Sequence, residues 1–365
     1  REEPDDDPRI EISVVLRLER LVEAPMPADI TAVLPEESPG YVEKKKVQPL
    51  LRKVAGFLEA LPRTAGEAAA LAAELANRGH KVSVGSDDRG VRFPGLFDGV
   101  ETHVLPAGRL GGGPLGYIRA AGRIMAGRSM ALRLYKELQP AAVIGFGGYP
   151  ALPALLAAFR AGVPTVIHEQ NAVLGRVNRF VAGRVNAIAT SYDEVERLKS
   201  AWKRKTHLIG NPVREAVLAL RDRPYPILDE EGIFRVLVTG GSQGATVLSQ
   251  VVPDGLALLP VHFRRRLQVT HQARIEDIDA VRAKYQAHGI PADVSTYITD
   301  MPEALAWAHI VIARAGASTI AELTAAGRPA ILVPLPSATD DHQTANAREI
   351  TTAGGARTIS QRAFT

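Results

Sequence analysis

A glycine-rich turn in the second half of the chain has the residue types of a phosphate-binding site. Residues 235–245, RVLVTGGSQGA, predict a strand, a turn with Gly240, Gly241 and Gly244, and the start of a helix. Glycine lets the backbone approach a phosphate closely, and a helix N-terminus directs unpaired N–H groups and partial positive charge at it. Ser242 adds a hydroxyl donor. A tight strand-to-helix turn that needs glycine only for steric reasons explains the same residues equally well.

Two common nucleotide sites do not fit this turn. No Lys follows the glycines, which excludes a P-loop. The next predicted strand, LQVTHQ at residues 267–272, ends without the acidic residue that binds a ribose in dinucleotide sites. A nicotinamide-dependent oxidoreductase is therefore disfavoured.

A second strand, turn and helix, RAGASTIAELTAAGRPAILVP at residues 314–334, contains a carboxylate with two interpretations. Thr319 and Glu322 have the spacing of a capping box, in which the glutamate closes the start of a helix. The same carboxylate could instead accept hydroxyl protons from a ribose, although the spacing alone favours the cap. Downstream, DDHQTANA at residues 340–347 places Asp, His, Gln and Asn after the next predicted strand, and Asp341 could be a helix N-cap.

The first half of the chain also has polar residues where predicted strands end. Residues 167–179, IHEQNAVLGRVNR, crowd hydrogen-bonding side chains behind the apolar run VPTV, and residues 144–153, IGFGGYPALP, place a glycine turn after another strand. Arg214 in IGNPVRE could hold an anion, and an ordinary solvated arginine explains it as well. Ligands of doubly wound sheets bind outside the carboxyl ends of the strands, so these segments are candidate ligand positions.

These segments belong to a βα rhythm that runs twice along the chain. Short β-branched runs alternate with Ala- and Leu-rich helical segments from about residue 81 onward, which predicts an α/β fold with two doubly wound parallel sheets. The charged, Pro-containing stretch 220–233 predicts a linker between a domain at 64–219 and a domain at 234–365, with a cleft between them. Residues 1–63 lack the rhythm and are predicted to be a poorly ordered or separately folded extension.

Two helices are predicted with particular features. The first begins at a capping box formed by Thr64 and Glu67 and ends at Gly79. The second, residues 116–138, combines apolar and basic side chains. It is either a helix that lies on anionic lipid or an ordinary domain helix with a solvated basic face. The apolar members that we single out are Ile118, Ile124, Met125, Leu132 and Leu134.

Composition bounds the remaining possibilities. The chain is 46% apolar and 23% charged, as expected for a globular protein, and its formal charge of +4 favours an anionic partner without choosing among phosphate, lipid and nucleic acid. Only 5% of residues are aromatic, which argues against a surface that stacks single-stranded bases. Cys is absent and the nine His are scattered, so no metal site is predicted. The most apolar long window, residues 141–159, contains two Pro and three Gly and is not predicted to span a membrane.

Seven stretches in order closely resemble the MurG family of peptidoglycan glycosyltransferases, and the resemblance covers residues 64–365. These stretches are GFGGYPALP, HEQNAVLGRVNR, GNPVR, TGGSQGA, YITDM, RAGASTIAE and DDHQTANA. The resemblance implies a glycosyltransferase type B fold of two Rossmann-like domains. It also implies inverting transfer of N-acetylglucosamine from UDP-N-acetylglucosamine to the 4-hydroxyl of lipid I, MurNAc-pentapeptide-pyrophosphoryl-undecaprenol, to give lipid II without a metal or other cofactor. The implied location is peripheral, on the anionic cytoplasmic face of the inner membrane, with no nucleic-acid partner.

The same resemblance assigns site residues. The second domain is expected to bind the donor, with Ser242 at the phosphates and the backbone of Ile298 at the uracil. Glu322 is expected at the ribose and Gln343 at the sugar hydroxyls. The remaining expected donor-binding residues are Asn171 and Arg214, which reach across the cleft, and Gln243, Ala317, Ser318 and Thr319. The first domain is expected to bind the acceptor through Gly147, Gly148, Tyr149 and Asn178.

The chain departs from the family pattern at the start of the first domain. MurG relatives carry G-G-T-G-G-H there, and its His is the usual candidate for the base that deprotonates the attacking hydroxyl. This chain instead reads LPRTAGEAAALAAEL at residues 61–75, with Glu67 near the vacant position. His168 and Glu169 are candidate substitute bases. We also expect the second domain to lack the helix-rich C-terminal segment of the relatives. A catalytically impaired UDP-sugar-binding protein of the same fold is therefore the alternative to an active enzyme.

Overall fold

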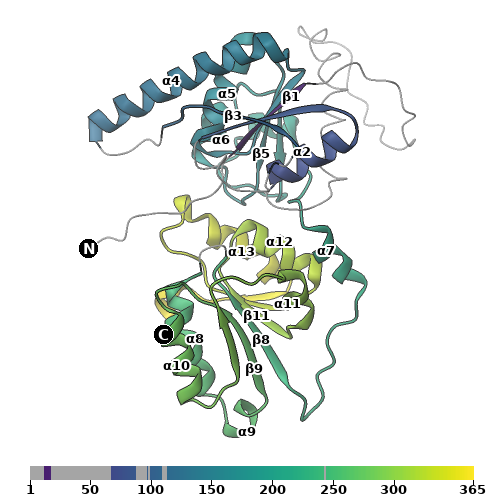
Figure 1. The fold of residues 1–365 in the computed structure, drawn as a ribbon, viewed down its shortest axis with the longest axis vertical. Coiled ribbons are helices and arrows are strands. Elements are labelled where there is room, and N and C mark those ends of the chain that lie inside the picture. The colour runs from purple at the N-terminus through teal and green to yellow at the C-terminus, as the bar shows by residue number, and fades with distance from the viewer. Residues whose placement is uncertain (1–11, 18–66, 88–96, 98, 109–112, 242–243) are drawn as a thin grey trace. The chain divides into compact units, whose positions relative to one another are not determined.

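The computed structural model describes residues 12–17, 67–87, 97, 99–108, 113–241 and 244–365 (Figure 1). The chain forms two compact units. Unit 1 contains Arg1–Gln170 and Leu174–Pro212, and unit 2 contains Asn171–Val173 and Val213–Thr365. Within the described residues, no helix is both long enough and apolar enough to cross a membrane.

Unit 1 is built on a sheet of seven strands in the order β3-β2-β1-β4-β5-β6-β7. Every neighbouring pair is parallel except the two that include β1, which runs antiparallel to both β2 and β4. The strands are β1 (Ile12–Arg17), β2 (Lys81–Ser86), β3 (Glu101–Val104), β4 (Ala142–Gly145), β5 (Thr165–Glu169), β6 (Ala187–Thr190) and β7 (Thr206–Leu208). The carboxyl ends of β4 to β7 therefore lie along one edge of the sheet.

Helices cover both faces of this sheet because the strand residues alternate in direction. In β4, Ala142 and Ile144 pack in one core cluster with α2, whereas Gly145 faces Leu155 of α5, so α2 and α5 lie on opposite faces. The long helix α4 packs on α5 (Figure 1). The helical segments of unit 1 are α2 (Glu67–Asn77), α4 (Gly113–Leu138), α5 (Gly148–Ala161), α6 (Arg176–Val181) and the 3₁₀ turn η1 (Ser200–Lys205).

The predicted end of α2 is confirmed. Gly79 has a φ of 81°, and the N–H groups of Gly79 and His80 donate to the carbonyls of Ala76 and Leu75. This is the hydrogen-bond pattern of a Schellman motif, which requires the left-handed conformation that glycine adopts without strain. The predicted capping box at the start of α2 involves Thr64, which lies outside the described residues.

The first strand of unit 1 differs from the prediction. We expected residues 1–63 to lie outside the two domains and both sheets to be wholly parallel, but Ile12–Arg17 forms β1 in the middle of the first sheet and runs against its neighbours. The six residues ISVVLR have the β-branched composition of a strand. They stand about fifty residues before α2, so the βα rhythm gave no indication that they join this sheet.

Unit 2 has a sheet of six strands that are all parallel, in the order β10-β9-β8-β11-β12-β13. The order rises in both directions from β8, so the predicted doubly wound topology is confirmed. The strands are β8 (Phe234–Thr239), β9 (Leu267–Gln272), β10 (Ala292–Ser295), β11 (Ile310–Ala313), β12 (Ala330–Leu332) and β13 (Ala356–Thr358). The helical segments are α7 (Glu215–Leu218), η2 (Ala219–Asp222), α8 (Thr246–Ala257), α9 (Val261–Arg264), α10 (Ile278–Ala287), α11 (Met301–Trp307), α12 (Ala317–Ala326), η3 (Thr339–Asp341), α13 (His342–Thr352) and η4 (Gln361–Ala363).

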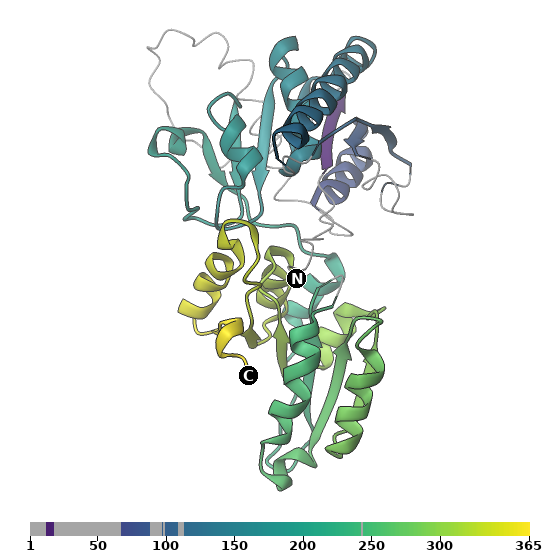
Figure 2. The ribbon, with the colours of Figure 1, turned by 90° about the vertical axis from the view of Figure 1, so that its left-hand side faces the viewer.

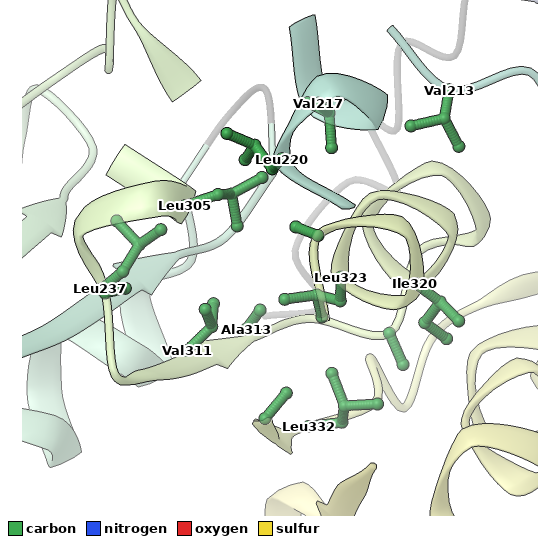
Figure 3. Packing of buried hydrophobic residues seen from close by; sticks show 14 of the residues in the cluster. Val213, Val217, Leu220, Leu237, Leu305, Val311, Ala313, Ile320, Leu323 and Leu332 are labelled. Atoms are coloured by element: carbon green, nitrogen blue, oxygen red, sulfur yellow. The ribbon is translucent and has the colours of Figure 1, made fainter. Parts of the chain in front are cut away.

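Two core clusters fill the two faces of this second sheet, and both views of the ribbon show its helices on either side (Figures 1 and 2). On one face, Val238 and Ile312 pack with residues of α8 and α10. On the other, Leu237 and Val311 pack with α11, α12 and α7, as Figure 3 shows. Val217 of α7 belongs to this second cluster, so residues that we had assigned to the end of the first domain contribute to the core of unit 2.

Candidate functional site

The glycine turn before α8 has a steric cause that the structure makes visible. A Cβ on Gly240 would lie 2.3 Å from the backbone nitrogen of Ala245, so only glycine fits there. Gly241 and Gly244 have φ values of 85° and 71°. The steric interpretation of the turn is therefore confirmed, and it is compatible with a phosphate site because α8 begins without a side-chain cap. The predicted phosphate residues Ser242 and Gln243 lie outside the described residues.

The N-terminus of α12 is the second candidate anion site of unit 2. Its N-cap, Gly316, makes no side-chain hydrogen bond to the helix, and Ala317, Ser318 and Thr319 form the first turn. The N–H groups of a first helical turn have no partner inside the helix, and the helix dipole places partial positive charge there. Three of the predicted donor-binding residues are thus brought together at one helix end.

Glu322 does not close a capping box. Thr319 is the third residue of α12 and not its N-cap, so that interpretation is wrong. The Arg214 Nε instead donates to Glu322 Oε1 across 2.7 Å, and the two side chains are 34% and 21% exposed. Arg214 is the N-cap residue of α7 and lies in unit 2 with Glu322, not in unit 1. The ion pair orients the carboxylate and leaves it accessible from solvent.

Gln343 lies near the start of α13 with its side chain almost fully buried. Its Oε1 accepts hydrogen bonds from the backbone N–H groups of Ala315, at 3.2 Å, and Leu335, at 3.0 Å. These two residues follow β11 and β12, so the carboxamide is fixed at the carboxyl edge of the sheet. Because the oxygen is held by two donors, the amide nitrogen is the group that Gln343 can direct at a ligand.

Three further candidate residues, Asp341, Ile298 and Asn171, lie in different parts of unit 2. Asp341 occupies the N-cap position of α13, but its carboxylate accepts from the Thr344 hydroxyl and makes no capping bond to the helix backbone. Ile298 lies between β10 and α11 in a stretch without regular structure, half-buried against the α11 and α12 side of the core. Asn171 belongs to unit 2, where its Oδ1 accepts from Asn346 Nδ2 at 3.0 Å.

The predicted acceptor residues gather at the N-terminus of α5 in unit 1. Gly147 is the N-cap, with φ of 87°, and Gly148 and the half-buried Tyr149 open the helix. Asn178 of α6 is 1% exposed, and its Oδ1 is buried and has no hydrogen-bond partner among the described residues. That oxygen lies 4.0 Å from the position that a Cβ on Gly147 would take. The site thus combines a helix N-terminus, which attracts an anion, with an unpaired acceptor, which suits a hydroxyl.

The two candidate substitute bases are held by internal contacts. His168 is fully buried, and its Nε2 is 3.2 Å from the Gly210 carbonyl oxygen. Burial lowers the pKa of His168 to about 4, and the hydrogen bond to Gly210 only partly opposes this. Glu169 is 2% exposed, and its Oε2 accepts from the Gly175 N–H and from Asn178 Nδ2, both at 2.8 Å. These contacts position α6 and argue against either side chain collecting a proton from a substrate.

A polar network at the same sheet edge was not predicted, although two of its members, Gln170 and Asn211, lie in the candidate stretches IHEQNAVLGRVNR and IGNPVRE. Ser191 Oγ donates to Asn211 Oδ1 at 2.6 Å, Asn211 Nδ2 donates to the Gln170 carbonyl at 3.0 Å, and Gln170 Nε2 donates to the Phe146 carbonyl at 3.1 Å. The available signal was position, because each of these polar residues comes within three residues of the end of β5, β6 or β7. In the part of the chain that the structure describes, no three His, Asp or Glu side chains are placed to hold a metal ion.

Comparisons with known proteins identify the family to which both halves of the chain belong. Residues 67–190 match the glycosyltransferase family 28 N-terminal domain, and residues 235–365 match the glycosyltransferase family 28 C-terminal domain. The chain is similar to the UDP-N-acetylglucosamine–N-acetylmuramyl-(pentapeptide) pyrophosphoryl-undecaprenol N-acetylglucosamine transferase of Zymomonas mobilis, with 64% identity over 295 residues, which are 81% of this chain and 76% of the relative. The protein of the same name from Erythrobacter litoralis is 61% identical over 296 residues, which are 81% of this chain and 74% of the relative.

Solved structures give the same picture. The crystal structure of Acinetobacter baumannii MurG is 30% identical, superposes with a TM-score of 0.64, and the match covers 80% of this chain and 81% of that one. The glycosyltransferase of kitacinnamycin is 16% identical with a TM-score of 0.56, over 80% of this chain and 82% of that one, which indicates a shared fold.

Proposed function

Because this chain belongs to glycosyltransferase family 28 and to its MurG branch, with the type B fold, we propose that it transfers N-acetylglucosamine from UDP-N-acetylglucosamine to lipid I. The product is lipid II for peptidoglycan synthesis. The observation that carries this proposal is the 64% identity with a transferase of that name over 81% of the chain.

The donor binds unit 2 at the carboxyl edge of its parallel sheet. The N-termini of α8 and α12 receive the diphosphate, Glu322 accepts from the ribose hydroxyls, and the backbone at Ile298 pairs with the uracil. Breaking the bond between sugar and phosphate leaves negative charge on UDP, and helix N-termini stabilise charge where it develops. Each such helix end contributes about 0.3–2 kcal/mol. This arrangement supports departure of UDP without requiring a metal ion.

The acceptor binds unit 1 at the N-terminus of α5. Gly147, Gly148 and Tyr149 offer backbone and hydroxyl groups to the pyrophosphate of lipid I. Asn178 Oδ1, which has no partner within the described part of the chain, accepts from one of its hydroxyls. The 4-hydroxyl oxygen attacks the anomeric carbon as the bond to UDP breaks, which inverts the configuration. The proton of that hydroxyl passes to a base, and neither His168 nor Glu169 is suited to the task by its contacts.

Helix α4 contacts the membrane surface. Leu115 and Ile118 are 69% and 67% exposed, Tyr117 and Met125 are also exposed, and Ile124 of the predicted apolar set is instead buried in the core. Apolar side chains beside Arg119 and Arg123 suit the boundary of a bilayer with anionic head groups. We infer that the protein is peripheral and that it works where UDP-sugars are available, on the cytoplasmic face.

Transfer of radiolabelled N-acetylglucosamine to a lipid I analogue tests the proposal. Labelled lipid product that requires both substrates supports it. Binding of UDP-N-acetylglucosamine without any product would favour the alternative, a UDP-sugar-binding protein of the same fold, and absence of UDP binding would reject both.

A further inference from the structure

We infer that Asn346 is a positioning residue of the donor site, which fixes the carboxamide of Asn171 for contact with the sugar nucleotide. The inference rests on the proposed function, because Asn171 is proposed to bind the donor. It adds a residue to which neither the sequence motifs nor the comparisons assign a role.

Asn346 is fully buried in the middle of α13, and both polar atoms of its side chain have hydrogen-bond partners. Its Oδ1 accepts from the Ala172 N–H at 2.8 Å. Its Nδ2 donates to Asn171 Oδ1 at 3.0 Å and to the Ala315 carbonyl oxygen at 3.3 Å. The side chain therefore uses both of its N–H groups and a carbonyl lone pair within unit 2.

These contacts determine the direction of the Asn171 side chain. Asn171 Oδ1 faces Asn346, so Asn171 Nδ2 lies on the opposite edge of the carboxamide. The bond from Ala172 holds the backbone next to Asn171 as well, so both the main chain and the side chain are fixed by one partner. A binding group that is held in place before the ligand arrives loses less conformational entropy on binding.

Asn346 also joins Asn171 to the rest of the proposed donor site. The N–H of Ala315 donates to Gln343 Oε1, and the carbonyl of the same residue accepts from Asn346. Ala315 immediately precedes Gly316, the N-cap of α12. One peptide segment thus connects the sugar-binding amide, the anion-binding helix end and the Asn171 carboxamide. Packing alone does not require these three hydrogen bonds of Asn346, because an apolar side chain of similar size would fill the same space.

The Asn346→Asp variant separates positioning from packing. Aspartate keeps the shape and an oxygen for the Ala172 N–H, but its carboxylate cannot donate to Asn171 Oδ1 or to the Ala315 carbonyl. We expect calorimetry with UDP-N-acetylglucosamine to show affinity about tenfold weaker than that of the unmodified chain. The matched control is Val281→Ala, a core change in α10 remote from the network, which lowers the melting temperature and leaves this affinity unchanged.

A double-mutant cycle shows whether Asn346 acts through Asn171. Asn171→Ala alone weakens binding about tenfold, and adding Asn346→Asp weakens it by no more than about twofold further. The inference would be overturned if Asn346→Asp kept full affinity, or if the fold loss of affinity in the double variant equalled the product of the two single losses. Either result would leave the proposed function intact. An unmodified chain that fails to bind UDP-N-acetylglucosamine would overturn the proposed function itself, and the inference with it.

Discussion

Gln343 shows how a single side chain acquires a direction from its neighbours. Its oxygen is held by two backbone N–H groups, so it presents a donor to the ligand. The Gln343→Glu variant keeps an oxygen for both N–H groups and removes the donor. We expect affinity for UDP-N-acetylglucosamine to fall about tenfold and affinity for UDP to fall less, because only the former contains the sugar.

Calorimetry with the two ligands measures this difference. The matched control is Gln286→Glu, the same change at an exposed position of α10, which leaves both affinities unchanged. Equal losses for UDP and UDP-N-acetylglucosamine would mean that Gln343 does not contact the sugar.

Two buried histidines make stability depend on pH. Burial lowers the pKa of His168 and of His271 to about 4, from an ordinary value of 6.5. Because the folded pKa is below the unfolded one, unfolding takes up protons, so the stabilising contribution is complete above pH 6.5 and is lost as the pH falls toward 4. We expect each histidine to account for a loss on the order of 3 kcal/mol over that range.

Urea unfolding at several pH values between 7 and 4 measures this loss of stability. His271→Gln flattens the decline of the free energy of unfolding, whereas the exposed His262→Gln does not. A decline of the same steepness in His271→Gln and in the unmodified chain would rule out His271 as a cause.

At the residue scale, the sequence indicated which side chains cluster but not what they touch. Glu322 and Gln343 were candidates by their place after predicted strands, and the resemblance to the MurG family gave their expected roles. Glu322 and its partner Arg214 lie 108 residues apart in the chain, and Asn346 and its partner Asn171 lie 175 residues apart. No local spacing could therefore pair them. The capping-box prediction failed for a related reason, because a four-residue pattern does not reveal where a helix starts.

The glycine turn before α8 allows a prediction at the scale of one element. Gly240→Ala places a Cβ against the backbone of Ala245, so part of the turn must shift. We expect a loss of about 1–3 kcal/mol of stability together with weaker UDP binding. Gly255→Ala in α8 has open space around the new Cβ and should instead gain about 0.5–1 kcal/mol from helix propensity. Thermal melting of both variants provides the comparison, and similar shifts in the two would contradict it.

The exposed apolar side of α4 allows a second prediction at the scale of one element. Leu115→Glu with Ile118→Glu removes two exposed apolar side chains and adds negative charge. Since one buried leucine-sized side chain contributes about 1.5–3 kcal/mol, we expect binding to phosphatidylglycerol vesicles to weaken at least tenfold. Vesicle sedimentation measures it, with Leu258→Glu as control, because Leu258 is 87% exposed in unit 2. An equal effect of the control would exclude α4 as the specific contact.

Element prediction succeeded where a β-branched or apolar run marks the strand and failed where the strand contains no such run. The β-branched runs that alternate with helical segments from residue 81 onward correspond to β2, β4 to β9, β11 and β12. β3 (ETHV), β10 (ADVS) and β13 (ART) contain no apolar run, so the sequence pattern did not indicate them. β1 was missed as a member of the first sheet because its position depends on contacts with β2 and β4, which lie at least 64 residues away in the chain.

At the scale of the whole molecule, repetition of the βα rhythm predicted the α/β class and two doubly wound sheets. The boundary between the units was harder to locate, because α7 and η2 follow the strands of unit 1 in sequence yet pack in the core of unit 2. Three residues after β5, Asn171–Val173, also belong to unit 2. Amino-acid composition does not indicate that such short segments pack with the other unit.

The proposed reaction joins the sugar of UDP-N-acetylglucosamine to lipid I. The most direct measurement follows labelled N-acetylglucosamine into the lipid fraction over time and determines the configuration of the new linkage. We expect a β-linked product that forms at a rate dependent on the concentrations of both substrates. Label that remains in UDP-N-acetylglucosamine, in a chain shown to bind that donor, would contradict it.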